Sequence, residues 1–174
     1  LSGDASDNVL DGGDGDDLLI GGGGADSFIG GAGIDTVSYA LSKVGVVVDL
    51  GAGTASGGEA EGDTFQGIEN VIGTKSADWI TGDDGGNELD GGAGNDTLSG
   101  GAGNDVLIGG AGADTLIGGQ GRDAVSYATS RSGVFIDLAR GIGSGRDAQG
   151  DTFVEIENVI GTNAADTLIG DEGE

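Results

Sequence analysis

Residues 91–117 read GGAGNDTLS-GGAGNDVLI-GGAGADTLI, three blocks of nine residues that follow one another without a gap. Positions 1, 2 and 4 of each block are glycine, position 6 is aspartate, and position 8 is a large apolar residue. Related blocks begin at Gly12, Gly21, Gly30, Gly73, Gly82, Gly91, Gly100, Gly109 and Gly118, with partial blocks at Gly3, Gly161 and Gly170. A short fixed period is the signature of a repeat architecture, so this period decides the prediction of the fold.

Each block is predicted to form a short strand preceded by a wide turn. In a strand of three residues the central side chain points to one face and its neighbours to the other, so position 8 faces the core. Glycines at positions 1, 2 and 4 allow positive φ angles and a close approach of backbones. Two blocks complete one coil of about 18 residues, and successive coils stack about 4.8 Å apart. We predict an all-β fold, a parallel β-roll or β-solenoid, which is right-handed because parallel crossovers generally are.

A longer repeat lies over the short one. Shifting the chain by 88 residues aligns it with itself, so that Gly62-Asp63-Thr64-Phe65 matches Gly150-Asp151-Thr152-Phe153. We therefore expect two copies of one unit, 1–88 and 89–174, joined in one continuous solenoid.

Each unit carries an insert of 34 residues, at 39–72 and 127–160, in which the regular nonapeptide is lost. Val44–Leu50 and Val134–Leu138 are rich in β-branched residues and are predicted to be strands. The last nine residues of each insert keep a weak form of the pattern, with Glu at position 6 and Val at position 8. We interpret the inserts as extra or wider coils of the same solenoid.

The charge balance is strongly acidic: 31 Asp and Glu face only 6 Lys and Arg, for a net charge of −25. Nucleic-acid binding needs a basic face and docking on anionic lipid needs basic clusters, so neither is a leading function. The chain has no Cys for disulfides and no His, the commonest general base. Its apolar runs are too short to span a bilayer. The natural partner of so many carboxylates is a cation.

The glycine content poses a folding problem. The chain has 42 glycines but only one Trp, two Tyr and four Phe. Glycine loses the most backbone freedom on folding, and a high net charge with few aromatic residues is typical of disordered chains. We infer that an external source of free energy helps this chain to fold.

Stacking of the coils places position-6 side chains of alternate blocks above one another, so that carboxylates form ladders that repel unless a cation lies between them. The expected pairs include Asp17 with Asp35, Asp96 with Asp114, and Asp105 with Asp123. The candidate metal ligands at position 6 are Asp17, Asp26, Asp35, Asp78, Asp96, Asp105, Asp114, Asp123 and Asp166, together with Asn8 and Asn87. Asp and Asn also favour turns, and for the two asparagines a plain turn-forming role has equal weight.

Four acidic residues recur in the inserts and have two open interpretations, as further metal ligands or as parts of a solvated acidic loop. They are Asp63, Asp151, Glu69 and Glu157. Asp49 and Asp137 end the predicted insert strands and are expected to be polar caps. The aromatic residues expected to fill the core are Tyr39, Tyr127, Phe65 and Phe153, whereas Trp79 is expected on the surface.

Calcium is the cation that suits these turns best. Carboxylates and carbonyl oxygens of glycine-rich turns form all-oxygen sites, and Ca²⁺ takes six to eight such ligands. Mg²⁺ demands a tighter octahedron and keeps its waters, and soft metals find no Cys or His here. We expect roughly six to eight calcium ions per chain.

The runs Gly91–Ser99 and Gly100–Ile108 resemble the RTX, or haemolysin-type, calcium-binding nonapeptide repeat. The resemblance covers most of the chain outside the inserts and is weaker in the Gly73–Thr81 block and at Asn8 and Asn87. It implies a calcium-binding module of a secreted bacterial protein, exported in one step without an N-terminal signal peptide and folded outside the cell. In keeping with this, no signal peptide is visible.

Three functional hypotheses remain open. The leading one is a non-catalytic module whose folding and stability depend on calcium. The second is a calcium-dependent adhesion module that binds a polysaccharide or a cell surface. The third is an accessory region of a secreted enzyme whose active site lies outside these residues. In each case we expect a monomer without enzymatic activity of its own, without nucleic-acid binding and without membrane insertion.

Overall fold

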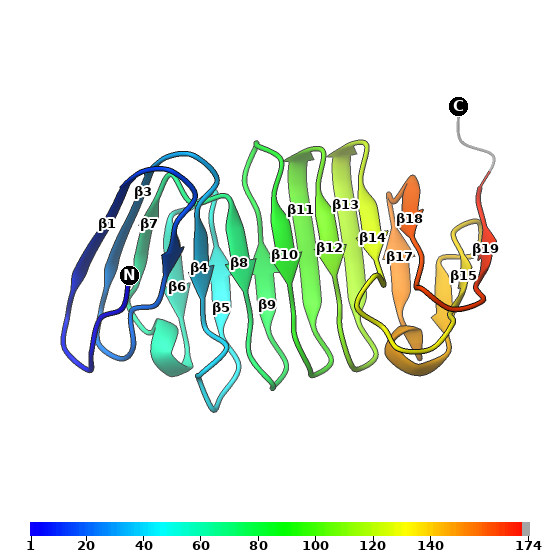
Figure 1. Cartoon of the computed structure of the whole chain (residues 1–174), viewed down its shortest axis with the longest axis horizontal. Helices are drawn as coiled ribbons and strands as arrows, with labels where there is room; N and C mark the ends of the chain where they lie inside the picture. Colours follow the sequence, from blue (N-terminus) through cyan, green and yellow to red (C-terminus); the bar gives the residue numbers. More distant parts are fainter. Residues whose placement is uncertain (172–174) are drawn as a thin grey trace.

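The computed structural model describes residues 1–171 as two β-sheets that face each other across one core. Figure 1 shows the coils stacked along the long axis of the molecule, with β1 at one end of the stack and β19 at the other. In the described part of the chain the helical segments are two 3-10 turns, η1 (Gly58–Ala60) and η2 (Arg146–Ala148). No helix within residues 1–171 is long and apolar enough to cross a membrane. The predicted all-β parallel roll is confirmed.

The smaller sheet has seven strands, all parallel, in the order β18-β14-β12-β10-β8-β4-β2. Its strands are β2 (Leu18–Leu19), β4 (Thr36–Ser38), β8 (Asn70–Ile72), β10 (Glu88–Asp90), β12 (Val106–Ile108), β14 (Ala124–Ser126) and β18 (Asn158–Ile160).

The larger sheet has twelve strands in the order β1-β3-β7-β6-β5-β9-β11-β13-β17-β16-β15-β19. The strands outside the inserts are β1 (Val9–Asp14), β3 (Ser27–Ala32), β9 (Trp79–Thr81), β11 (Thr97–Gly103), β13 (Thr115–Gly121) and β19 (Thr167–Ile169). The insert strands are β5 (Val47–Asp49), β6 (Thr54–Ser56), β7 (Thr64–Gln66), β15 (Phe135–Asp137), β16 (Ile142–Ser144) and β17 (Thr152–Val154).

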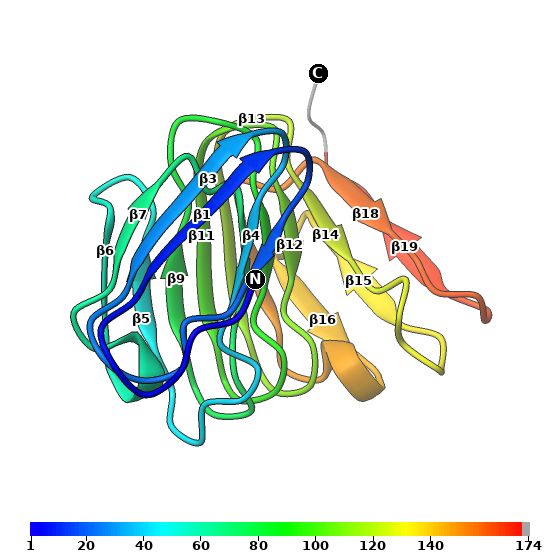
Figure 2. The same ribbon diagram turned by 60° about the vertical axis from the view of Figure 1, so that its left-hand side comes forward.

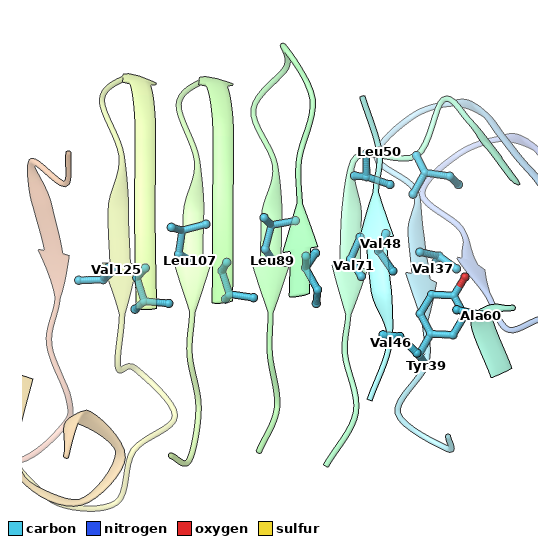
Figure 3. Packing of buried hydrophobic residues seen from close by; sticks show 14 of the residues in the cluster. Val37, Tyr39, Val46, Val48, Leu50, Ala60, Val71, Leu89, Leu107 and Val125 are labelled. Carbon is cyan, nitrogen blue, oxygen red and sulfur yellow. The ribbon is translucent and has the colours of Figure 1, made fainter. Parts of the chain in front are cut away.

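The register follows the nonapeptide. Residues 18 apart pair in neighbouring coils, as Leu98 does with Leu116 in the larger sheet and Leu89 with Leu107 in the smaller one. Position 8 therefore stacks on position 8 along both sheets, and these side chains are buried almost without exception from Leu10 to Val125. Figure 3 shows Leu89, Leu107 and Val125 directed into the space between the sheets, in line with Val37 and Val71. One such row of apolar residues per sheet forms the centre of the core, to which the inserts add buried residues such as Tyr39, Val46 and Tyr127.

The inserts match the predicted extra or wider coils of the solenoid only in part. Strand β6 runs antiparallel to both β5 and β7, and β16 does the same between β15 and β17. Each insert thus gives three strands to the larger sheet and one, β8 or β18, to the smaller sheet. Only its last nine residues form the expected coil.

Hairpin turns cause the difference. Gly53 and Gly141 have φ angles of 68° and 65°, which glycine adopts without strain. Asp49 Oδ1 accepts a hydrogen bond from Ala52 N at 2.7 Å, and Asp137 Oδ1 accepts one from Arg140 N at 3.1 Å. These bonds confirm the predicted capping role of the two aspartates, at turns that reverse the chain.

The aromatic residues lie largely as expected. Tyr39 and Tyr127 are buried, and the Phe65 ring stacks on Phe28 with 5.7 Å between ring centroids. Phe153 is buried in the second unit. Trp79, on the outer face of β9, is 58% exposed, which confirms its surface position.

Close stacking of the turns explains the glycines at positions 2 and 4. Gly119 has a φ of 108°, and a Cβ on it would collide with the backbone carbonyl of Gly101 in the preceding coil. Gly121 is placed in the same way against Gly103. Figure 2, turned by 60°, shows the coils lying one behind another from β1 and β3 in front to β18 and β19 at the far end. A side chain at Gly119 or Gly121 would push two coils apart.

We predict that Gly119→Ala lowers the free energy of unfolding of the calcium-loaded chain by at least about 1 kcal/mol, because it adds both φ strain and a backbone collision. Urea unfolding followed by circular dichroism measures the change. Gly23→Ala is the matched control, since a Cβ at Gly23 meets nothing within 4 Å and the residue has no positive φ. Equal stability of the two variants would contradict the role assigned to Gly119.

Candidate metal centre

The turns stack on two opposite edges of the roll. We call first edge the one whose turns lead into the twelve-stranded sheet, and second edge the one whose turns lead into the seven-stranded sheet. On each edge, the residue at position 6 of one turn lies directly beside its counterpart in the next coil. The predicted neighbour pairs Asp17–Asp35, Asp96–Asp114 and Asp105–Asp123 are all present.

A hydrogen bond from backbone to carboxylate joins each pair. On the second edge, Asp105 N donates to Asp123 Oδ1 at 2.9 Å, and Asp123 N donates in turn to Glu157 Oε2 at 2.8 Å. Asp35 N donates to Glu69 Oε2 in the same way, at 2.8 Å. The two insert glutamates therefore continue the ladder of the nonapeptide aspartates.

The first edge has the same ladder, but it is interrupted at the first insert. Asp26 N donates to Asp63 Oδ1 at 2.7 Å, where the first stretch ends. A second stretch runs through Asp78, Asp96 and Asp114 to Asp151, with N–H···Oδ1 distances of 2.8 to 3.0 Å. The ladder starts again from within each insert, where Val46 N donates a hydrogen bond to Asp78 Oδ1 and Val134 N donates one to Asp166 Oδ1.

Using one carboxylate oxygen in the ladder leaves the other inside the turn. Six such Oδ2 atoms are buried and have no hydrogen-bond partner within the described residues: those of Asp26, Asp35, Asp96, Asp105, Asp114 and Asp123. Asp17, in the terminal coil of the second edge, stands in the same kind of turn but is partly exposed. A buried, unpaired carboxylate oxygen costs several kcal/mol, so each of these atoms calls for a partner that the described residues do not supply.

The donor set fits a hard divalent cation. Within residues 1–171 no three acidic side chains converge on one point, so a metal at these turns would complete its shell with backbone carbonyls. Glycine carbonyls of adjacent coils crowd the same turns, as Gly101 does beneath Gly119. Two carboxylates surrounded by carbonyl oxygens are the ligands that Ca²⁺ accepts with variable geometry.

A different kind of turn occurs where position 2 is not glycine. There the position-2 amide donates to the side-chain oxygen of position 6. The four cases are Asp4 N to Asn8, Thr74 N to Asp78, Asp83 N to Asn87 and Thr162 N to Asp166, at 2.7 to 2.9 Å. In these turns the oxygen that is unpaired elsewhere already has a partner. Calcium at the position-6 residues of these four turns stays a prediction. The geometry gives it less support there than at the turns with glycine at positions 1, 2 and 4.

Asp63 and Asp151 differ again. Their Oδ2 atoms accept hydrogen bonds from buried tyrosine hydroxyls, Tyr39 Oη at 2.8 Å and Tyr127 Oη at 2.6 Å. The sequence pointed to these tyrosines as core residues but not to this contact. The recurrence of both partners at the 88-residue shift is the signal that could have revealed it.

Position 5 carries a second, shorter set of contacts that the sequence interpretation missed. Asn95 Oδ1 accepts from Ala113 N at 3.0 Å, and Asn104 Oδ1 accepts from Arg122 N at 2.9 Å. Asp7 and Asp16 do the same for the coils above them. The polar residue at position 5 therefore ties its turn to the next coil, whereas position 6 ties its turn to the previous one.

Burial and the neighbouring carboxylates shift the pKa values of the ladder. Desolvation, with a smaller contribution from Asp114, raises the pKa of Asp96 to about 7. Desolvation and Asp123 raise the pKa of Asp105 to about 6. Desolvation likewise raises the pKa of Asp151 to about 6, although the Tyr127 hydroxyl acts in the opposite direction. In the absence of metal these groups therefore stay protonated to a higher pH than an ordinary aspartate does.

Comparison with known proteins agrees with the geometry. A family model described as the RTX calcium-binding nonapeptide repeat, in four copies, matches residues 2–37, 63–98 and 90–125, more than half of the chain. A search of curated proteins found no match.

The pKa shifts predict that acid stabilises the metal-free roll. An aspartate whose folded-state pKa is raised opposes folding when it ionises, so stability is highest near pH 4 and falls as the pH rises to about 7. Far-UV circular dichroism in a chelator at pH 4.5 and 7.5 measures the effect. Asp96→Asn weakens the pH dependence more than the control Asp14→Asn, which removes an exposed charge. Metal-free β-structure that increases with pH would contradict this account.

Proposed function

Because the chain belongs to the family of RTX calcium-binding nonapeptide repeats, we propose that it is a non-catalytic module whose folding and stability depend on calcium in its glycine-rich turns. The repeats of this family bind calcium and are typical of secreted bacterial proteins. The role in folding, the residues involved and the extracellular setting are our proposal.

One observation carries the proposal: six buried carboxylate oxygens that have no partner within residues 1–171, all in turns with glycine at positions 1, 2 and 4. A cation at each pair would supply the missing partner and remove the repulsion between stacked carboxylates. The residues proposed to hold calcium are Asp17, Asp26, Asp35, Asp96, Asp105, Asp114 and Asp123, with backbone carbonyls of the same turns.

The charge of the chain supports the same conclusion. Six to eight calcium ions would bring the net charge of −25 to about −10, which relieves the self-repulsion of the compact state. Each ion that binds only the folded chain adds about 2.7 kcal/mol of stability when calcium is a hundredfold above its dissociation constant. Several such contributions exceed the deficit of a glycine-rich chain, because the net stability of a domain is itself small.

This dependence suits an extracellular module. Calcium sites of extracellular modules have dissociation constants of about 10⁻⁴ to 10⁻³ M, far above cytosolic calcium. Under our proposal the chain is unfolded before export and folds outside the cell. The ladder carboxylates are repeated copies of one environment rather than a pair tuned apart for acid and base roles, which supports a binding role over a catalytic one.

Substitution of a ladder carboxylate tests the proposed ligands. We predict that Asp105→Asn lowers the number of calcium ions bound per chain by about one, since its Oδ1 accepts the Asn87 amide in the ladder and its buried Oδ2 has no partner within the described residues. Equilibrium dialysis with metal analysis measures the number. Asp14→Asn removes the same charge from an exposed position and is expected to leave it unchanged. Equal calcium content in both variants would exclude Asp105 as a ligand.

A further inference from the structure

The six unpaired oxygens are not spread evenly along the chain. They lie within residues 12–38 and 91–126, which contain all the turns with glycine at positions 1, 2 and 4. The segments 39–88 and 127–169 also contribute side chains to the ladders, but within the described residues none of their carboxylate oxygens is both buried and unpaired. The two kinds of segment therefore differ in whether the second carboxylate oxygen of a turn has a hydrogen-bond partner in the protein.

Where each stretch of the first-edge ladder reaches an insert, a tyrosine hydroxyl is the hydrogen-bond partner of this second oxygen. Asp63 resembles the metal-type aspartates in that its Oδ1 accepts the amide of the preceding coil, from Asp26 at 2.7 Å. Its Oδ2 accepts the Tyr39 hydroxyl at 2.8 Å, and both side chains are buried. Asp151 repeats this arrangement with Asp114 N at 3.0 Å and Tyr127 Oη at 2.6 Å.

A phenol hydroxyl is a suitable neutral substitute for a cation here. It donates one hydrogen bond to the carboxylate oxygen, and hydrogen bonds to charged groups are about twice as strong as neutral ones. Burial beside Asp63 raises the pKa of Tyr39, and burial beside Asp151 raises that of Tyr127, so both hydroxyls keep their protons. The hydroxyl therefore satisfies the buried oxygen at any calcium concentration.

In the turns that follow, the buried polar side chains also find hydrogen-bond partners within the protein. Thr74 donates to Asp78 from its amide at 2.7 Å and from its hydroxyl at 3.0 Å, and Thr162 does the same to Asp166 at 2.8 Å and 2.8 Å. Asn87 donates from its amide group to the Glu69 carbonyl at 2.8 Å. Within segment 39–88, the buried ladder residues Asp63, Asp78 and Asn87 thus all have hydrogen-bond partners in the protein.

We propose that Tyr39 and Tyr127 take the place of a calcium ion at Asp63 and Asp151, so that segments 39–88 and 127–169 form at lower calcium than segments 12–38 and 91–126. This inference rests on the proposed calcium-dependent folding and specifies how it is divided along the chain. The two inserts are then pre-formed pieces on which the calcium-dependent coils assemble.

The chain contains its own reporter. Trp79 is the one tryptophan of the sequence and lies in β9, where it pairs with Val47 of insert strand β5. Its amide donates to Val46 O at 2.9 Å. On its other side Trp79 pairs with Thr97 of β11, so its fluorescence follows the packing of β9 between the first insert and β11, whereas far-UV circular dichroism follows the whole roll.

The test is a calcium titration of the full chain followed by both signals. In the unsubstituted protein we expect the Trp79 transition to have its midpoint at least about threefold below that of the circular dichroism, because the insert segment needs fewer ions. Coinciding midpoints would overturn the inference while leaving calcium-dependent folding intact. No response to calcium in either signal would instead overturn the proposed function.

Removing both hydroxyls tests the role of the tyrosines. In Tyr39→Phe/Tyr127→Phe, Asp63 and Asp151 each gain an unpaired buried oxygen, and the Trp79 midpoint is expected to rise about threefold or more, toward that of the circular dichroism. The matched control is Ser42→Ala/Ser130→Ala, which removes two buried insert hydroxyls that donate only to the backbone carbonyls of Val44 and Ser132. An unchanged separation of midpoints in the tyrosine variant, or an equal loss in the serine control, would overturn the inference.

A second variant keeps the test valid if the loss of the hydroxyls prevents folding. Adding Asp63→Asn/Asp151→Asn to the tyrosine variant removes the buried charges together with their donors, so the separation of the midpoints is expected to return. Failure to recover it would show that the charge on these aspartates does not set the calcium requirement.

Discussion

In the regular part of the roll, a hydrogen bond from the position-6 amide to a carboxylate oxygen ties each coil to the next, and most other features of the structure follow from that bond. A carboxylate used in this way brings its second oxygen into the turn, where water is excluded. Asp96 and Asp114 show the consequence, with one oxygen in the ladder and the other unpaired. The second oxygen then needs either a proton donor or a cation inside the turn. Which of the two it receives correlates with the residue at position 2.

The same requirement accounts for the glycines. With glycine and a positive φ at position 2, as at Gly92 and Gly101, the turn packs against the preceding coil and its position-6 oxygen stays unpaired. With threonine there, as at Thr74, the amide turns toward the carboxylate and closes it. Turns with glycine at position 2 thus suit calcium, whereas turns with threonine there need none. The strand that follows the turn keeps its register in both cases.

The sequence predicted the parts of the fold that depend on a strict period. Position 8 places Leu98 above Leu116 in the core, and the 18-residue coil sets the carboxylate pairs, because both follow from alternation along a strand and from coil length alone. The antiparallel strands β6 and β16 were not predicted, since they depend on glycine turns at Gly53 and Gly141 that have no place in the nonapeptide. The Tyr39–Asp63 contact was not predicted either, because it joins residues 24 positions apart across an irregular insert.

The central claim is that the regular part of the roll holds its structure only with calcium. Hydrogen exchange of the backbone amides, measured in a chelator, in magnesium and in calcium, tests it most directly. We expect the amides of residues 91–126 to be protected in calcium and to exchange freely in the chelator and in magnesium. Protection of these amides in the chelator would contradict it, because the four buried, unpaired oxygens of this stretch would then be tolerated without any ion.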